Sequence, residues 1–104
     1  MLVNKQKYNS GDIVTMKISN GDEIVATFVE ETDEGFMIKK PATVIPAQDG
    51  IVLMGTLFTS SSELPMLISF QHVMLHGLTG KKIADSYIHQ TSGIQIAPAG
   101  SIAR

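Results

Sequence analysis

The sequence contains no cysteine and no tryptophan, and only 17% of its 104 residues are charged. Without cysteine there are no disulfide bonds, thiolate nucleophiles or thiolate metal ligands, which favours an intracellular, cytoplasmic setting. No apolar run approaches the roughly 20 residues that a membrane-spanning helix needs. Residues 1–7 also lack the apolar segment of a signal peptide. We therefore expect a soluble chain with no membrane partner.

What the sequence does have is apolar content. Hydrophobic residues make up 43% of the chain, which is too much for a disordered protein, and 104 residues suit one hydrophobic core. We expect a single domain over residues 1–104. So little charge predicts that another subunit covers part of the surface. A net charge of −2 gives no bulk attraction to nucleic acid, so such binding would need local basic clusters.

The first half of the chain predicts three consecutive antiparallel strands. Residues 12–19 are typical of a strand, and Asn20-Gly21 then predicts a type I′ hairpin turn, because both residues tolerate positive φ. The partner strand spans residues 23–30, and an acidic turn leads from it to a third strand at residues 36–39. Two alternating faces are expected on the partner strand: Ile24, Ala26 and Phe28 on one, Val25, Thr27 and Val29 on the other.

The second half predicts further strands and one helix, separated by proline, glycine and serine. The expected elements are an edge or bent strand between Pro41 and Pro46, a turn at residues 48–50, a strand at 51–58 with a bulge at Gly55, a serine-rich loop at 59–63, and a strand from Met66 to about His76. A helix over residues 80–91 follows, with Ile83, Ala84, Tyr87 and Ile88 on one face, Thr79 and Gly93 as caps, and a tail at 94–104 that adds an edge strand or packs on another subunit.

Two motifs resemble those of the Sm, LSm and Hfq family. Ile18-Ser19-Asn20-Gly21, followed by Ala26 and Phe28, is similar to the first Sm motif, although Ala26 replaces a glycine. Asp33 with Phe36-Met37-Ile38 is similar to its acidic loop and next strand, without the usual loop asparagine. Phe70-Gln71-His72-Val73-Met74 resembles the second motif of Hfq-type rings, although Gln71 replaces a lysine and the archaeal and eukaryotic Arg-Gly is absent. The resemblance covers residues 10–76.

This resemblance implies a mainly β fold: a strongly bent, five-stranded antiparallel barrel of Sm-like (SH3) type with a short C-terminal helix. The core would span residues 10–76, and residues 79–104 would form a helix and tail extension. In that family identical chains close a ring, so we expect five to seven copies, with a pentamer favoured, and the strand at residues 66–75 paired with the next subunit. Small phage-encoded rings are equally similar, and their setting would be the host cytoplasm.

The function implied is a non-enzymatic ring that binds single-stranded RNA or DNA, RNA first, without a metal or cofactor. Aromatic rings stack on unpaired bases while lysines neutralise phosphates. The expected nucleic-acid-binding residues are Asp33, Phe36, Lys39, Lys40, Phe70, Gln71 and His72. Two alternatives stay open. One is a structural or assembly ring, including a viral one, that binds no nucleic acid, and the other is a monomeric SH3-like adaptor.

Other residues have plainer interpretations. Phe36 can simply fill the core, and Tyr87 can lie in the core or a subunit interface. His72 and His76 would lie roughly 13 Å apart on a strand, too far to share a metal ion. Residues 77–82 lack the spacing and the Ser or Thr of a phosphate-binding loop. The acidic turn and the serine-rich loop are expected to be solvated, without catalytic roles.

Overall fold

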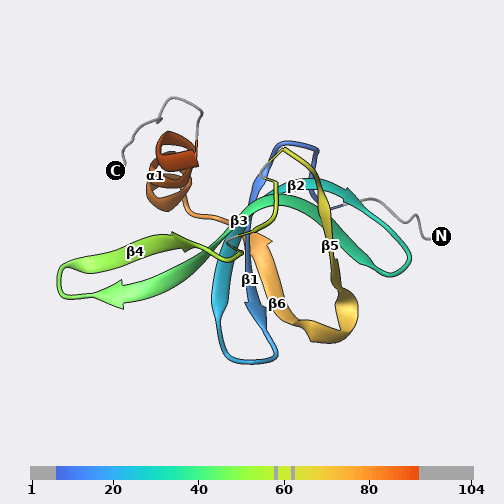
Figure 1. The fold of residues 1–104 in the computed structure, drawn as a ribbon, viewed down its shortest axis with the longest axis horizontal. Coiled ribbons are helices and arrows are strands. Elements are labelled where there is room, and N and C mark those ends of the chain that lie inside the picture. The colour runs from blue at the N-terminus through green and yellow to red at the C-terminus, as the bar shows by residue number, and fades with distance from the viewer. Residues whose placement is uncertain (1–6, 58, 62, 92–104) are drawn as a thin grey trace.

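The computed structural model describes residues 7–57, 59–61 and 63–91. In these ranges the chain forms six strands, one 3₁₀ helix and one α-helix (Figure 1). In chain order they are β1 (Ile13–Ile18), β2 (Glu23–Glu31), β3 (Gly35–Ala47), β4 (Gly50–Gly55), β5 (Met66–Ser69), η1 (Phe70–His72), β6 (Val73–Leu78) and α1 (Lys81–Thr91).

All six strands belong to one antiparallel sheet, so the expected mainly β class with a short C-terminal helix is confirmed. The strand order is β4-β3-β2-β1-β6, and β5 also pairs with β3. The expectation of five strands closed into a barrel is wrong. β3 is 13 residues long and holds β5 along its first part and β4 along its second. Among the described residues β5 and β6 are joined through η1 and do not pair with each other, so the sheet stays open.

The β1–β2 hairpin is confirmed, but its turn differs from the type I′ prediction. The Gly21 amide donates to the Ile18 carbonyl oxygen at 2.8 Å, and the Ile18 amide donates to the Asp22 carbonyl oxygen at 2.9 Å. Gly21 has φ +95°, whereas Asn20 is not among the described residues with positive φ. This is a three-residue loop in which a type I turn is followed by a left-handed glycine. Asn20 instead accepts a hydrogen bond from the Asp22 amide at 2.9 Å through Oδ1.

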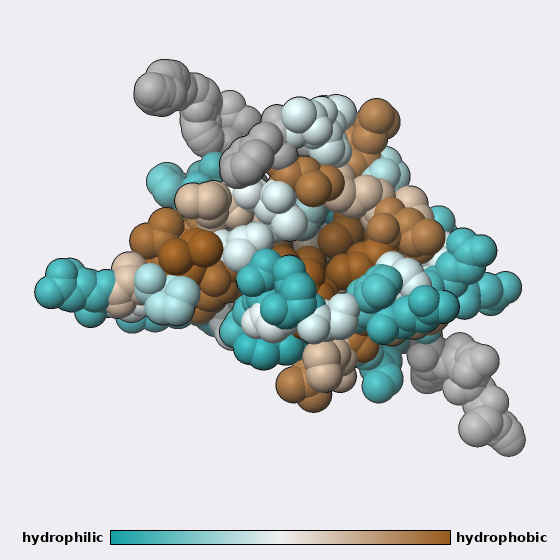
Figure 2. All heavy atoms as spheres, turned by 60° about the horizontal axis from the view of Figure 1, so that its bottom comes forward, coloured by the Kyte–Doolittle hydropathy of each residue, from teal (hydrophilic) through white to brown (hydrophobic). Residues whose placement is uncertain are grey.

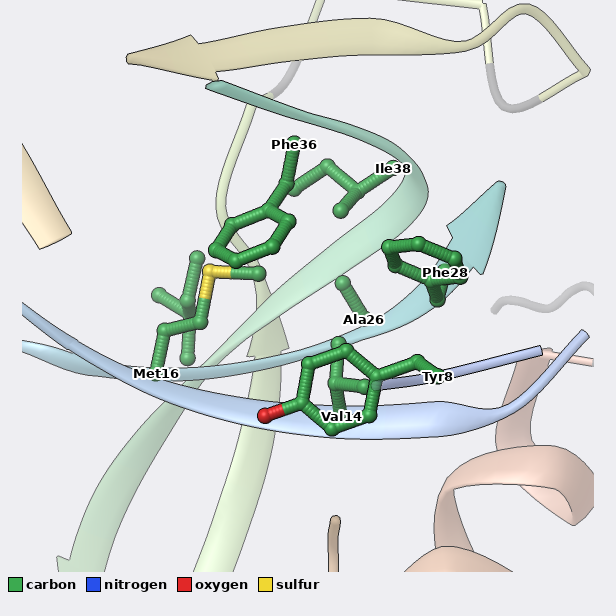
Figure 3. Packing of buried hydrophobic residues seen from close by; sticks show 8 residues of the cluster. Tyr8, Val14, Met16, Ala26, Phe28, Phe36 and Ile38 are labelled. Carbon is green, nitrogen blue, oxygen red and sulfur yellow. The ribbon is translucent and has the colours of Figure 1, made fainter. Parts of the chain in front are cut away.

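The main core lies on one face of β2, as the alternation predicted. Ile24, Ala26 and Phe28 are buried there, and Figure 3 shows their neighbours from β1, β3 and the segment before β1 pointing into the same space. The rings of Phe28 and Phe36 meet edge to face, with their centroids 6.1 Å apart. The buried members of this core are Tyr8, Val14, Met16, Ile24, Ala26, Phe28, Phe36 and Ile38.

The long strand β3 passes through both prolines that were expected to bracket a separate strand. Lys40 and Pro41 together oppose Ala26 of β2, because the register shifts there. This local bulge places Lys40 at φ +52° and bends the strand, as a residue inserted into one strand does. Beyond the bulge, residues 42–47 pair with β4 to form a projecting hairpin, seen at the left of Figure 1 and called the arm (residues 42–55) below. Gly55 pairs in register with Ala42, so no bulge occurs at that position.

The single strand expected from Met66 to His76 is two strands separated by η1. The Ser69 hydroxyl accepts a hydrogen bond from the Gln71 amide at 3.2 Å and so caps the 3₁₀ turn. After this turn the chain crosses from β3 to β1, where Thr15 pairs with Gly77. Residues 66–76 are mostly apolar and contain no glycine or proline, so their composition gave no signal for the capped turn.

Helix α1 confirms the helix predicted over residues 80–91, although its contacts differ in part. Tyr87 is buried, but Ile88 on the predicted apolar face is 49% exposed. Thr79 does not cap the helix in the expected way, since its hydroxyl lies 2.7 Å from that of Thr15 and the helix begins two residues later. The predicted Gly93 cap and the tail at 94–104 lie outside the described residues.

Candidate functional site

The structure brings the hairpin turn next to the 3₁₀ helix, although more than 50 residues separate them in the chain. The Ser19 amide donates to the His72 carbonyl oxygen at 2.9 Å, and the Ser19 hydroxyl lies 3.0 Å from His72 Nδ1. Two segments that are distant in the chain therefore meet. The surface that results is called the η1 surface below; it consists of Ser19, Asn20, Gly21, Phe70, Gln71 and His72.

Two phenylalanines were predicted to stack on bases, and they differ in exposure. Phe36 is only 2% exposed, so both of its ring faces are covered inside the chain. Phe70 is 38% exposed and packs edge to face on Phe36, with centroids 5.1 Å apart. Phe36 therefore supports Phe70 from beneath, and Phe70 is the ring that a ligand can reach.

The charges around the η1 surface are acidic. The Phe70 amide donates to the Glu34 carbonyl oxygen at 3.0 Å, which brings the exposed turn with Asp33 and Glu34 beside η1. Asp22 bonds to Asn20 on the other side. Carboxylates repel phosphate groups, so this surface is poorly suited to the backbone of a nucleic acid.

The two lysines expected to assist Phe36 lie elsewhere, under α1. Burial raises the pKa of Tyr87, whose hydroxyl donates to the Lys40 carbonyl oxygen at 2.8 Å and lies 3.0 Å from the Thr27 hydroxyl. Lys40 Nζ donates to the carbonyl oxygen of Thr91, the last residue of α1, at 3.4 Å. Lys39 pairs with Thr27 of β2. These lysines hold the helix against β3 and are not part of the η1 surface.

His72 and His76, which the sequence places four residues apart, have separate partners. His76 Nδ1 lies 2.6 Å from the Tyr8 hydroxyl, and its ring meets Phe36 edge to face at 4.9 Å. Burial, and then the nearby charge of Glu31, raises the pKa of Tyr8. No group of three or more His, Asp or Glu side chains that could hold a metal ion occurs in the described part of the chain. The Tyr8–His76 contact was missed because 68 residues separate the pair.

Two strand edges, rather than a polar cluster, are the most distinctive feature of the described chain. In an antiparallel pair, successive residues direct their backbone groups alternately toward the partner strand and away from it. On β6 the Thr79 amide donates to the Ile13 carbonyl oxygen, so the backbone groups of His76 and Leu78 point away from β1. At the end of β5 the Phe70 amide donates to the Glu34 carbonyl oxygen. By the same rule, the backbone groups of Leu67 and Ser69 point away from β3. Each strand has one partner strand among the described residues, so both outer edges are free to pair.

Large apolar side chains lie along these two edges. Leu67 of β5 is 46% exposed, and on β6 Met74, Leu75 and Leu78 are each 64–69% exposed. Met74 is the extra residue at a register shift between β6 and β1. Beside β6 a groove of about 570 Å³ opens between the sheet, the arm and α1, and Leu75 and Leu78 are among the residues that line it. Edges that combine free backbone groups with apolar side chains are suited to pairing with another chain.

Comparison with known proteins adds no assignment, since no family model and no curated protein matches the chain. Neither helix of the described residues is long and apolar enough to cross a membrane.

Proposed function

We propose that this chain is a non-enzymatic assembly subunit, in which the β5 edge of one copy pairs with the β6 edge of the next until an Sm-like ring closes. The two free edges, with their exposed apolar residues, carry this proposal. Because two different edges meet, the contact is head to tail, and such contacts form a closed ring when the rotation between copies allows it. A ring of five to seven copies remains our expectation.

The proposed joint satisfies groups that a single copy leaves open. Leu67 and Ser69 of β5 can exchange about four backbone hydrogen bonds with His76 and Leu78 of the neighbouring β6, each contributing about 0.5–1.5 kcal/mol. Leu67 then lies near the exposed residues of β6. Burial of such a side chain contributes about 1.5–3 kcal/mol when it is complete, and less here because each is already partly covered. The joint would therefore stabilise both edges without any change in the fold.

A head-to-tail joint predicts an unusual mixing behaviour. Met74→Lys places a charge on the β6 edge and leaves β5 intact, whereas Leu67→Glu blocks β5 and leaves β6 intact. Each variant alone should be a monomer of about 11 kDa, the mass of one copy. An equimolar mixture should form a one-to-one dimer, because each variant still has one competent edge. Native mass spectrometry resolves all of these species.

The control is Ile88→Lys, which adds the same charge at an exposed site on α1, away from both edges. It should assemble like the unchanged chain. If both edge variants assemble normally, or if their mixture stays monomeric while each is folded by circular dichroism, the β5–β6 joint is wrong. A monomeric unchanged chain would instead favour an SH3-like adaptor.

A second candidate function is binding of single-stranded nucleic acid, RNA ahead of DNA, at the η1 surface. It is favoured by one observation: Phe70, Gln71 and His72 are consecutive exposed residues of η1, which combine an aromatic ring with hydrogen-bonding side chains. An aromatic face next to hydrogen-bonding groups is the usual arrangement for an unpaired base. The nearby carboxylates of Asp33 and Glu34 oppose it, because they repel phosphate groups.

Titration of a labelled uridine- or adenine-rich oligonucleotide tests this second function. Micromolar binding at low salt that is lost in Phe70→Ala would support it, and an absence of binding at low salt would end it. Gln90→Ala on α1 is a suitable control, because it removes a polar side chain remote from η1.

A further inference from the structure

Among the described residues, one face of the arm is covered and the other is not. In the register of the arm, Val44 pairs with Leu53 on one face, and Ile45 pairs with Val52 on the other. The first face packs under α1, where Leu53 is buried with Tyr87. The second face is called the outer arm face; it consists of Thr43, Ile45, Val52 and Met54. Ile45, Val52 and Met54 are 38%, 51% and 49% exposed.

The outer arm face continues the core face of the sheet beyond the core itself. Thr43 pairs with Ile24 of β2, whose side chain is buried in the main core. Further along β3 the same face carries Ile45, but no described element covers it there. Figure 2 shows the resulting apolar surface over the arm, at the left of the molecule. A two-stranded ribbon with an uncovered apolar face is marginally stable in water, so a partner on this face would stabilise the arm.

The edge of the arm is less available than its face. Gln90 of α1 donates from Nε2 to the Leu53 carbonyl oxygen at 2.9 Å, and this carbonyl points away from β3. Helix α1 therefore covers both the inner face and part of the outer edge of β4. A partner of the arm would have to approach the outer arm face.

We propose that the outer arm face binds the same face of a second copy, so that two rings stack through their arms. This inference rests on the proposed ring. The face contains no charged residue, and Asp49 at the tip is the only charge in residues 42–55. A two-fold contact places each face against its own copy, so an uncharged apolar face meets an equally uncharged one. A charged partner would find no opposite charge on the outer arm face.

The contact between two arms is small, but a ring repeats it once per copy. Four side chains bury far less than the roughly 1,000 Å² that a stable interface needs. A ring presents one arm per copy, however, and two stacked rings engage five to seven arm pairs at once. Linked contacts of this kind gain affinity by effective concentration without any new type of contact. Isolated copies should therefore not pair through their arms at micromolar concentration, whereas rings should.

The experiment is native mass spectrometry and light scattering on the full chain, with Val52→Lys and Met54→Lys as arm variants and Ile88→Lys as the control. The unchanged chain and the control should have twice the mass of a single ring, and both arm variants should have half of that mass. Raising the salt concentration should favour the stack of the unchanged chain, because screening weakens repulsion between copies of net charge −2 while the apolar contact persists.

The masses of the unchanged chain and the arm variants show which proposal fails. An unchanged chain with the mass of one ring overturns stacking and leaves the ring intact. Arm variants that are folded and keep the full mass also overturn stacking, because the particle is then a larger single ring. An unchanged chain of 11.2 kDa overturns both proposals. Val52→Lys and Met54→Lys test the same contact. If one of them fails to fold, the mass of the other still decides between stacked and single rings.

Discussion

Replacing Gly35 with alanine tests how β5 is held on the sheet. Gly35 begins β3 and pairs with Ser69, and a Cβ at this position would overlap the backbone carbonyl of Ile68. The clash is with backbone, so β5 must move away from β3. Overpacking costs about 1–3 kcal/mol, and one or two lost backbone hydrogen bonds cost about 0.5–1.5 kcal/mol each. We expect Gly35→Ala to lower the free energy of unfolding by about 1.5–6 kcal/mol.

The matched control is Gly55→Ala at the end of β4, where the nearest atom to a new Cβ is the Leu57 carbonyl oxygen at 3.8 Å. This substitution should be neutral or stabilising by about 0.4–1 kcal/mol, because alanine restricts the unfolded chain. Urea unfolding followed by circular dichroism, at one protein concentration, measures both, since association shifts apparent stability. Equal stability of the two variants would refute the close approach of β5 to Gly35.

Two further predictions concern the contacts that hold α1 and the bulge. Tyr87→Phe should cost about 1–2 kcal/mol, because it leaves the Lys40 carbonyl and the Thr27 hydroxyl without their partner. The raised pKa of Tyr87 means that its contribution is full below pH 10, its ordinary pKa, and is lost as the pH rises further, so the phenylalanine variant should lose less stability above pH 10 than the unchanged chain. Lys40→Gly should be more stable than Lys40→Ala by about 1 kcal/mol in thermal unfolding, because φ is +52° and only glycine adopts it without strain. Both variants lose the Nζ bond to Thr91, so equal stability would contradict the strain argument.

Local patterns in the sequence predicted the elements well and their connections less well. Alternation from Ile24 to Phe28 identified both faces of β2, and the 3.6-residue period identified α1. Residues 66–76 contain no glycine or proline, so nothing in their composition revealed the crossing from β3 to β1 at η1. Pro41 was expected to mark one end of a separate edge or bent strand, but it lies within β3 at a bulge, where no amide is needed.

The candidate site was predicted in part, and the failures have a common cause. The hairpin turn at Ser19 meets His72, a contact that no pattern in the sequence indicated because 53 residues separate the pair. Phe36 and Lys40 do not join them at the surface, because the burial of a side chain depends on the whole fold rather than on its neighbours in the chain. Free strand edges are invisible in a sequence until the pairing of every strand is known. The resemblance implied that residues 66–75 pair with the next subunit, but it treated them as one strand, whereas the structure divides them between the edges of β5 and β6.

The mass of the unchanged chain in solution tests the central claim most directly. Sedimentation equilibrium at several micromolar concentrations should give a particle of at least five copies, that is, an integer multiple of 11.2 kDa, because a closed ring leaves no β5 or β6 edge free. A species of 11.2 kDa that does not associate as the concentration rises would contradict it.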